Sequence, residues 1–292
     1  MTDGASLPDA RASPSGLHFP ASADRQFVRR EMITHASAVA LWAATAAITF
    51  PYLFTQTAPY GKFVSAGWGP LVNGRLGWLA QEIVSPVAVW VGLSRGVRAF
   101  PELARSSAAS AADASYVRCL FALWCAHYAN RAVVFPLTRE LSSTAAATVL
   151  CAVGFNLING FLVGAELAST TTAPPITRIV VGAVVFVIGA WINVSSDARL
   201  RRLRAERPAG ADRYVLPSGG LFDLVACPNY LGECVEWCGF TILANGARST
   251  TAFAFWTFAN LFPRAVATRA WYRRRFGDAY PRHRRAMIPY IA

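Results

Sequence analysis

Long apolar segments are the feature that most constrains how this chain can fold. Several predominantly hydrophobic runs approach or exceed the roughly 18–20 residues that cross a bilayer as a helix. Hydrophobic residues make up 54% of the 292 positions and charged residues only 15%, unlike an ordinary soluble domain. Because backbone groups inside lipid must be hydrogen-bonded within their own segment, such runs should be helical. The sequence therefore predicts an all-α, polytopic membrane protein.

Seven transmembrane helices are predicted, separated by segments rich in Gly, Pro or polar residues. Their approximate ranges are 33–53, 76–93, 116–137, 144–167, 176–193, 224–244 and 250–272. Irregular connections are expected over 56–75 and 94–115. Residues 1–30 are rich in Ala, Ser, Pro, Asp and Arg and lack the apolar core of a signal peptide. We therefore expect a disordered tail over 1–30 and one membrane domain over 31–292.

Positive charge is concentrated beside the predicted spans. The formal net charge is +12, and Lys62 is the only lysine. We expect one arginine-rich loop from Arg199 to Arg213 and a second arginine cluster at the C-terminus. Such clusters mark the cytoplasmic side and meet anionic headgroups, so we place both in the cytoplasm, the N-terminus on the opposite side, and expect no nucleic-acid partner. The arginine excess also fits phosphate recognition or a GC-rich genome.

Cysteine spacing gives no sign of a metal site. The six cysteines lie in or just before apolar segments, and no two form a Cys-x2-Cys pair. We expect buried free thiols at Cys119, Cys125, Cys151, Cys227, Cys234 and Cys238, and no bound metal.

Two polar stripes interrupt the later spans. Asn193 and Asp197 are four residues apart and share one helix face, and Asn229, Glu233 and Glu236 form a stripe at offsets 0, 4 and 7. Polar stripes within lipid usually face a bundle interior or a ligand. No Gly-x-Gly-x-x-Gly, Walker loop or His-Glu-x-x-His motif is present. Any dinucleotide must therefore be held by helices and loops, with arginines on its phosphates.

The order and spacing of these residues resemble the C-terminal half of steroid 5α-reductases (3-oxo-5α-steroid 4-dehydrogenases), here of a bacterial type. The shared positions are Asn193, Asp197, Arg201, Arg204, Gly219-Gly220-Leu221-Phe222, Asn229, Glu233, Glu236, Arg264, Tyr272, Tyr280-Pro281, Arg284 and Ile288-Pro289. The resemblance implies NADPH-dependent reduction of the Δ4 C=C bond of a 3-oxo-Δ4-steroid to the 5α-dihydro product. It also implies a cytoplasmic cofactor-binding loop region.

Position by position, the resemblance implies a set of cofactor contacts. These are Asn193, Asp197, Arg201, Arg204, Tyr214, Asn229, Glu233, Arg264, Tyr272 and Arg284, assisted by Arg131 from the third span. Ser195 and Thr268 depart from the pattern, since animal members have His at the first position and often at the second. For Arg269, Arg273, Arg274 and Arg275 we favour contact with lipid headgroups.

The family's reacting groups are a Gln-Glu pair on the second span and a His-Tyr pair on the third, matched here by Gln81-Glu82 and His127-Tyr128. The resemblance implies that Tyr128 donates a hydrogen bond to the substrate carbonyl and that Glu82 polarises or shares this contact. A phenol with its ordinary pKa of about 10 stays protonated at neutral pH and can donate. From the residues alone, Glu82 could instead be a structural carboxylate, and Glu233 could pair with an arginine of the bundle.

Other functions remain open at this point. Isoprenylcysteine-methyltransferase-like enzymes that use S-adenosylmethionine, and other sterol C=C reductases, share the Pro-Asn-Tyr-x-x-Glu pattern seen at Pro228–Glu233. A non-catalytic lipid-binding membrane protein is a third possibility. The expected partners are a steroid or other lipophilic enone and membrane lipid.

Overall fold

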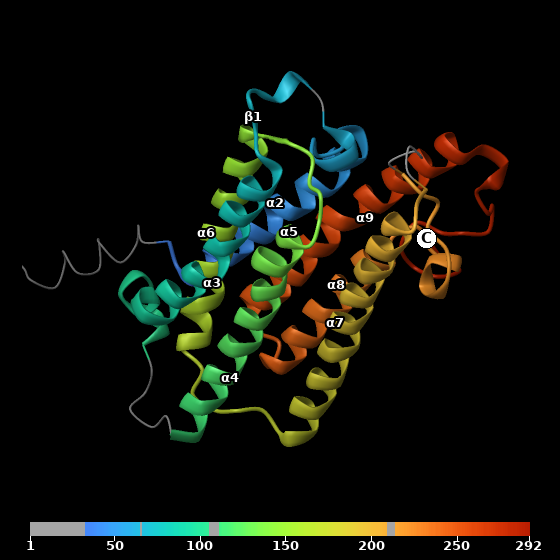
Figure 1. Cartoon of the computed structure of the whole chain (residues 1–292). Helices are drawn as coiled ribbons and strands as arrows, with labels where there is room; N and C mark the ends of the chain where they lie inside the picture. Colours follow the sequence, from blue (N-terminus) through green and yellow to red (C-terminus); the bar gives the residue numbers. More distant parts are fainter. Residues whose placement is uncertain (1–32, 65, 105–110, 209–213) are drawn as a thin grey trace, which may run out of the picture. The chain divides into compact units, whose positions relative to one another are not determined.

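The computed structural model describes residues 33–64, 66–104, 111–208 and 214–292, and it is almost entirely helical there (Figure 1). Seven helices of this part of the chain overlap the seven predicted spans one by one. They are α2 (His35–Thr55), α3 (Gly74–Ala99), α4 (Ala111–Tyr128), α6 (Ala146–Ala168), α7 (Ile176–Ala205), α8 (Pro228–Leu243) and α9 (Arg248–Phe276).

The prediction of an all-α membrane protein is confirmed. Four of these helices, α2, α3, α6 and α7, are long and apolar enough to cross a membrane. Many of their large apolar side chains point outward, such as Ile48 and Leu150, which are 71% and 70% exposed. Outward-facing apolar side chains are what contact with lipid tails requires. The predicted tail over 1–30, and Arg213, lie outside the described residues.

Short elements complete the connections. The two strands β1 (Leu71–Val72) and β2 (Thr144–Ala145) pair antiparallel and tie the start of α3 to the start of α6. Asn73 caps α3, since its side-chain oxygen accepts the N–H groups of residues 75 and 76 at 3.0 and 3.1 Å. The remaining short elements are η1 (Gly61–Phe63), η2 (Ala66–Trp68), η3 (Pro101–Leu103), η4 (Ala129–Val134), α5 (Phe135–Leu137), η5 (Gly220–Asp223) and η6 (Gly277–Ala279).

Two predicted connections are wrong in part, because helices continue beyond the apolar runs. Helix α7 ends at Ala205, so Arg199, Arg201, Arg202 and Arg204 are helical rather than part of a loop. Helix α3 extends to Ala99 and α4 begins at residue 111, so both ends of the predicted 94–115 linker are helical. Arginine and alanine have high helix propensity. The apolar pattern therefore reports the thickness of the membrane and not the length of the helix.

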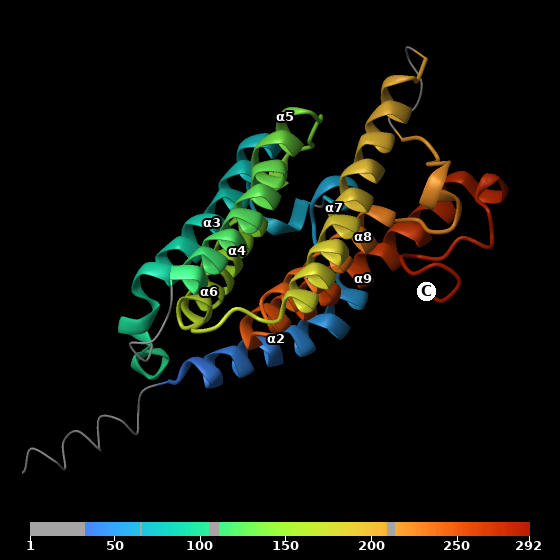
Figure 2. The same cartoon turned by 90° about the horizontal axis from the view of Figure 1, so that it is seen from below.

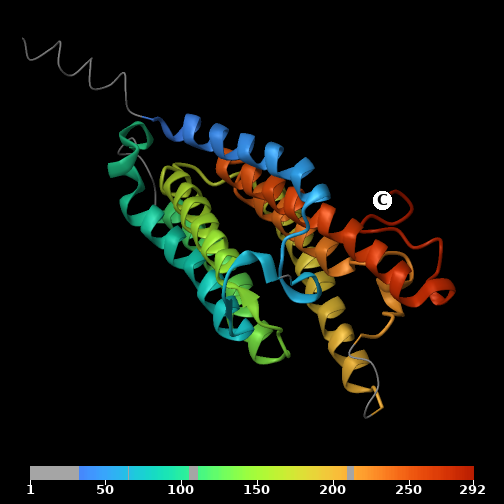
Figure 3. The same ribbon diagram turned by 90° about the horizontal axis from the view of Figure 1, so that it is seen from above.

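The helices associate in closely packed pairs. Helix α3 packs along α6, α7 along α8, and α2 along α9. Figure 2 shows α3, α4 and α6 in one layer and α7, α8 and α9 in another, and Figure 3 shows α2 beside α9. Small residues allow the closest approach: a Cβ on Gly189 of α7 would lie 2.1 Å from the backbone nitrogen of Glu236 on α8. Close backbone contact is the usual source of helix association in lipid.

An aromatic cluster fills the interior. Trp124 and Tyr128 of α4 pack against Trp237 and Phe240 of α8 and Phe253 of α9, with the two indole centroids 4.8 Å apart. All five side chains are buried. Edge and tilted contacts of this kind add to the stabilisation from burial alone.

The predicted burial of the cysteines is only partly right. All six are free, but Cys119, Cys151 and Cys238 are exposed, and only Cys227 is fully buried. Their apolar surroundings in the sequence belong to helix faces that point outward.

Replacing Gly189 by Ala should lower the melting temperature of the detergent-solubilised protein. The new methyl group would overlap the α8 backbone, and overpacking of this kind typically costs about 1–3 kcal/mol. The matched control is Gly154→Ala on α6, where a Cβ would meet nothing within 4 Å and helix propensity favours Ala by up to about 1 kcal/mol. Equal melting temperatures for the two variants would contradict tight α7–α8 packing.

Candidate functional site

The structure brings the two polar stripes together. Asp197 on α7 accepts a hydrogen bond from the side-chain amide of Asn229 on α8 at 3.2 Å. Asn193, Asp197, Glu233 and Glu236 are all buried. The predicted shared faces thus point at each other across the α7–α8 contact, as lipid-inserted polar groups require.

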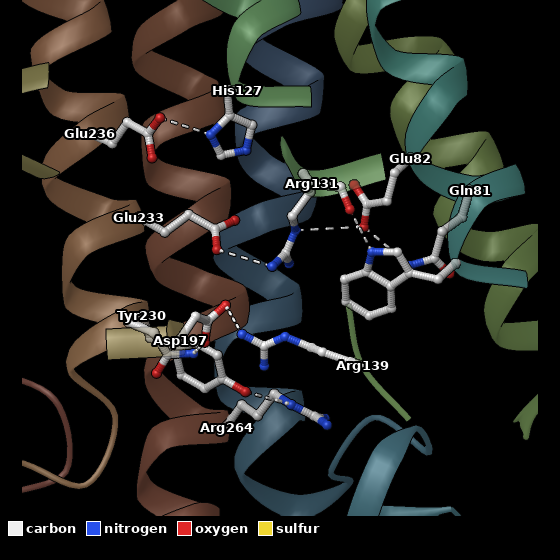
Figure 4. Close-up of polar contacts among 12 residues, drawn as sticks. Gln81, Glu82, His127, Arg131, Arg139, Asp197, Tyr230, Glu233, Glu236 and Arg264 are labelled. Atoms are coloured by element: carbon white, nitrogen blue, oxygen red, sulfur yellow. Dashed lines mark hydrogen bonds and ion pairs between the residues drawn. The ribbon is translucent and has the colours of Figure 1, made fainter. Parts of the chain in front are cut away.

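Arg131 lies between two carboxylates in the centre of the bundle (Figure 4). Its guanidinium is 3.8 Å from Glu82 on α3 and 3.6 Å from Glu233 on α8. It also lies over the ring of Trp78, 4.8 Å from the centroid. The Gln81 amide donates to Glu82 at 3.2 Å. These contacts join α3, α4 and α8 through one buried cation.

A π-helical turn, η4 (Ala129–Val134), carries Arg131. The N–H of Phe135 donates to the carbonyl of Asn130, five residues back. The Arg131 carbonyl would pair with residue 136 in the same register, but Pro136 has no N–H. The indole N–H of Trp78 donates to that carbonyl instead, at 2.9 Å. The widened turn is thus explained by one proline and one tryptophan from another helix.

A second ion pair lies toward the end of the bundle that carries the α7 arginines. The Arg139 guanidinium is 2.9 Å from Asp197 and lies over the Phe135 ring at 4.1 Å. Its Nε is buried and has no hydrogen-bond partner among the described residues. Arg139 was not among the predicted site residues.

Arg264, on α9, anchors the loop before α3. It donates to the carbonyls of Ala58 and Tyr60, both at 3.0 Å, and to the hydroxyl of Tyr230 at 3.2 Å, and its guanidinium stacks on the Tyr60 ring. Arg264 is therefore already bound to protein groups and holds residues 58–63 against the bundle.

These elements surround a cavity of about 420 Å³, a size typical of ligand sites. Eight predicted residues line it: Arg131, Asp197, Arg201, Arg204, Tyr214, Asn229, Arg264 and Tyr272. Other lining residues were not among the predicted cofactor contacts: Tyr60, Lys62, Trp78, Arg139 and Arg207, together with Gln81, which was predicted at the reacting end. The expected connection over 56–75, which contains the only lysine, was the one available signal for Tyr60 and Lys62.

The charge of this cavity favours an anion. Its lining contains six arginines and one lysine but only two carboxylates, on Glu140 and Asp197. Arg201 and Arg204 are half-buried and form no ion pair with any described residue. Guanidinium groups suit phosphate oxygens. Within the described ranges, no three His, Cys, Asp or Glu side chains gather as a metal would need.

Five predicted residues do not line this cavity. Asn193 lines a smaller one of about 170 Å³ between α4 and α7. Glu82, Glu233 and Tyr128 lie behind the lining, and Glu82 and Glu233 reach it through Arg131. Arg284 is buried elsewhere, where it donates to the Pro217 carbonyl at 2.6 Å and lies 3.5 Å from the carboxylate of Asp223.

Lys62 has an unusual environment for a loop residue. Its ammonium lies over the rings of Tyr272 and Trp271, 4.4 and 4.7 Å from their centroids. Burial lowers the pKa of Lys62 to about 8, and Arg264 and Arg204 add repulsion. Cys227 is close by, but burial raises the pKa of its thiol to about 11, so this thiol stays neutral where Lys62 titrates. Lys62 therefore loses its proton at a lower pH than an ordinary lysine does.

Acylation should therefore modify Lys62 at an unusually low pH. The neutral amine is the reactive form, and half of Lys62 should be neutral near pH 8, against a pKa of about 10.4 for an ordinary lysine. Because the chain has one lysine, peptide mass spectrometry after reaction with an acylating reagent at several pH values follows this side chain alone. A midpoint near the ordinary lysine value would show that the amine is solvated and not buried.

Comparison with known proteins agrees with the resemblance predicted from the motifs. A sequence model of the 3-oxo-5-alpha-steroid 4-dehydrogenase family matches residues 142–292. The chain is 36% identical over 255 residues to steroid 5-alpha-reductase DET2 of Gossypium hirsutum, which covers 83% of this chain and 92% of that relative. It is 35% identical over 244 residues to 3-oxo-5-alpha-steroid 4-dehydrogenase 1 of Bos taurus, which covers 80% and 88%. The chain belongs to the 3-oxo-5-alpha-steroid 4-dehydrogenase family.

Proposed function

We propose that this protein is an NADPH-dependent steroid 5α-reductase, which reduces the Δ4 double bond of a 3-oxo-Δ4-steroid. Family membership supports the reaction class. The observation that carries the finer proposal is the position of Arg131, which lines the arginine-rich cavity and also contacts Glu82, the carboxylate expected at the substrate carbonyl. A cofactor site and a reacting site would thus share one side chain.

The lining residues fit a dinucleotide. Arg201, Arg204 and Lys62 would hold phosphate groups, while Asp197 and Asn229 offer the oxygens and amide that ribose hydroxyls need. Arg264 and Tyr60 would keep the loop closed over the site. When bound, NADPH supplies the hydride of the reduction.

The reacting end would lie among buried polar groups at the aromatic cluster. Negative charge develops on the substrate carbonyl as the double bond is reduced, and a preorganised donor there lowers the barrier. Tyr128 is packed between Trp124 and Trp237, so its hydroxyl is held in place before the substrate arrives. Arg131 and Gln81 hold the Glu82 carboxylate beside this position.

The location of the site follows from charge. The arginines of α7 and of the C-terminal end of α9 lie beside membrane-spanning helices, and such residues are retained in the cytoplasm. We therefore place the cofactor cavity on the cytoplasmic side and the N-terminus on the other. A steroid, being apolar, would reach the bundle through the lipid.

The test is an assay with purified protein in detergent or nanodiscs. Incubation with NADPH and testosterone or progesterone should give the 5α-dihydro product by mass spectrometry. A parallel incubation with S-adenosylmethionine and an isoprenylated cysteine acceptor tests the methyltransferase alternative. If the protein converts neither substrate set but still binds lipid, the result supports the non-catalytic alternative.

Replacing Tyr128 by Phe should leave the fold and NADPH affinity intact, because the ring still packs against Trp124. Turnover should fall by about 10²-fold or more, as for loss of one transition-state donor. The measurement is product formation at saturating NADPH, with Tyr116→Phe on the same helix as the control for loss of a hydrogen-bonded, half-buried tyrosine hydroxyl. Wild-type turnover in the Tyr128 variant would remove this residue from the mechanism.

Cofactor choice gives another prediction. The guanidinium groups of the cavity exceed what a pyrophosphate needs, so NADPH should bind more tightly than NADH, and raising salt should weaken the difference. Arg204→Gln should reduce the NADPH preference by about tenfold or more, the value of one charged hydrogen bond. Arg274→Gln, an exposed position on the same side of the molecule, is the control. Equal affinities of the wild type for both cofactors would contradict the proposal.

A further inference from the structure

A histidine–carboxylate pair lies inside the bundle, outside the arginine-lined cavity. His127 Nδ1 on α4 lies 2.8 Å from Glu236 Oε1 on α8, and the two side chains are only 6% and 4% exposed (Figure 4). The imidazole also packs against Trp237 and Tyr128, with centroids 4.6 and 5.1 Å apart. The backbone of Glu236 is fixed by the close approach of Gly189. The ring therefore has one orientation.

The other ring nitrogen of His127 is available. Nε2 has no hydrogen-bond partner among the described residues, and His127 lines the 170 Å³ cavity between α4 and α7. Asn130 and Asn193 line the same cavity. At about 30 Å³ of liquid volume per molecule, a cavity of this size has room for a few waters beside these polar groups. A carboxylate on one nitrogen, with the second nitrogen free of described partners and the ring lining a cavity, is the arrangement of a general acid–base histidine.

The small cavity adjoins the large one. Arg131, Phe135 and Asp197 line both. These three side chains form a shared wall between the arginine-lined cavity and the imidazole. The small cavity is thus a neighbour of the arginine-lined cavity, and two of the three residues between them are charged.

Reduction of an enone consumes a proton. The hydride adds to the β-carbon, the π electrons of the C=C bond move toward the carbonyl oxygen, and the α-carbon then takes up H⁺. Each turnover thus needs one proton from water, delivered into a buried site. Histidine is the side chain that binds and releases a proton most readily near neutral pH.

On this basis, which rests on the proposed function, we infer that the His127–Glu236 pair is the proton-transfer site of the reduction, loaded from water through the small cavity. The Nε2–H bond of His127 breaks as its proton moves by way of cavity water to the enolate. The neutral ring is then reprotonated from water. Glu236 keeps the ring oriented and balances its charge.

Several other charged or titratable groups face this pair. They are Glu82 on α3, Arg131 and Tyr128 on the α4 segment, Asp197 on α7 and Glu233 on α8. The pH dependence of the enzyme will reflect all of them. A part of the pH dependence is assigned to the pair only if it changes when His127 or Glu236 is replaced.

The test uses two conservative variants of the full chain. His127→Asn keeps a donor at the Nδ1 position toward Glu236, and Glu236→Gln keeps an acceptor toward His127. Each should leave NADPH affinity unchanged and lower turnover by about 10²-fold or more, the usual size of a general acid–base contribution. The pH profile of turnover should lose the limb due to the histidine, and the solvent deuterium isotope effect should rise because proton transfer becomes rate-limiting.

The control is His35→Gln, which replaces another buried imidazole while keeping a partner for the Leu162 carbonyl. Wild-type turnover in both His127 and Glu236 variants would overturn the inference and leave the proposed function standing. Lower turnover with a lower melting temperature, and with unchanged pH profile and isotope effect, would show a structural role and also overturn it. A wild-type protein that reduces no steroid with NADPH would end both proposals.

Discussion

The arrangement of the site depends on one buried cation. A guanidinium inside a membrane bundle is stable only beside acids, and Arg131 has Glu82 on one side and Glu233 on the other. These partners come from α3 and α8, which belong to different layers. Loss of both carboxylates would leave the charge uncompensated, and an unpaired buried charge commonly costs about 3–5 kcal/mol. One contact therefore holds the layers in register and sets where the polar groups of the interior lie.

Closely packed and loosely packed helix–helix interfaces have different roles in this bundle. Helices α3 with α6, and α7 with α8, approach closely through small residues such as Gly164 and Gly189. Between α4 and α7, by contrast, a cavity remains, and Glu236 of α8 also lines it. Close packing within pairs makes the open space between pairs possible, because the polar side chains that line it are held by rigid backbones. The small cavity and three ion pairs, Arg131–Glu233, Arg139–Asp197 and His127–Glu236, lie where the segment from α4 to the loop after α5 meets α7 and α8.

Much of this could be predicted from the sequence. Apolar length located the helices, and the helical period placed Asp197 on one polar face with Asn193 and Asn229 on another with Glu233 and Glu236. The extension of α7 was missed, because hydropathy ends where the lipid ends while Arg201 and Arg204 still favour a helix. The π turn could not be predicted, since it depends on a contact with Trp78 from another helix. The role of Arg264 was not predicted either, because the sequence does not show that its guanidinium donates to the carbonyls of Ala58 and Tyr60. The alternative that Glu233 pairs with an arginine of the bundle is supported by its contact with Arg131, at 3.6 Å.

The π turn at 129–134 changes the direction in which the side chains of α4 face relative to those that follow the turn. One extra residue in the turn rotates everything before it by about 100° relative to an unbroken α-helix. His127 and Tyr128 precede the insertion, and Phe135, whose ring lies under the Arg139 guanidinium, follows it in α5. With an ordinary residue in place of Pro136, the Arg131 carbonyl could regain a backbone partner and the Trp78 indole would lose its acceptor. The side chains before and after the π turn therefore face other relative directions than they would on an unbroken α-helix. Pro136 and Trp78, which lies more than fifty positions before Arg131, together set this difference.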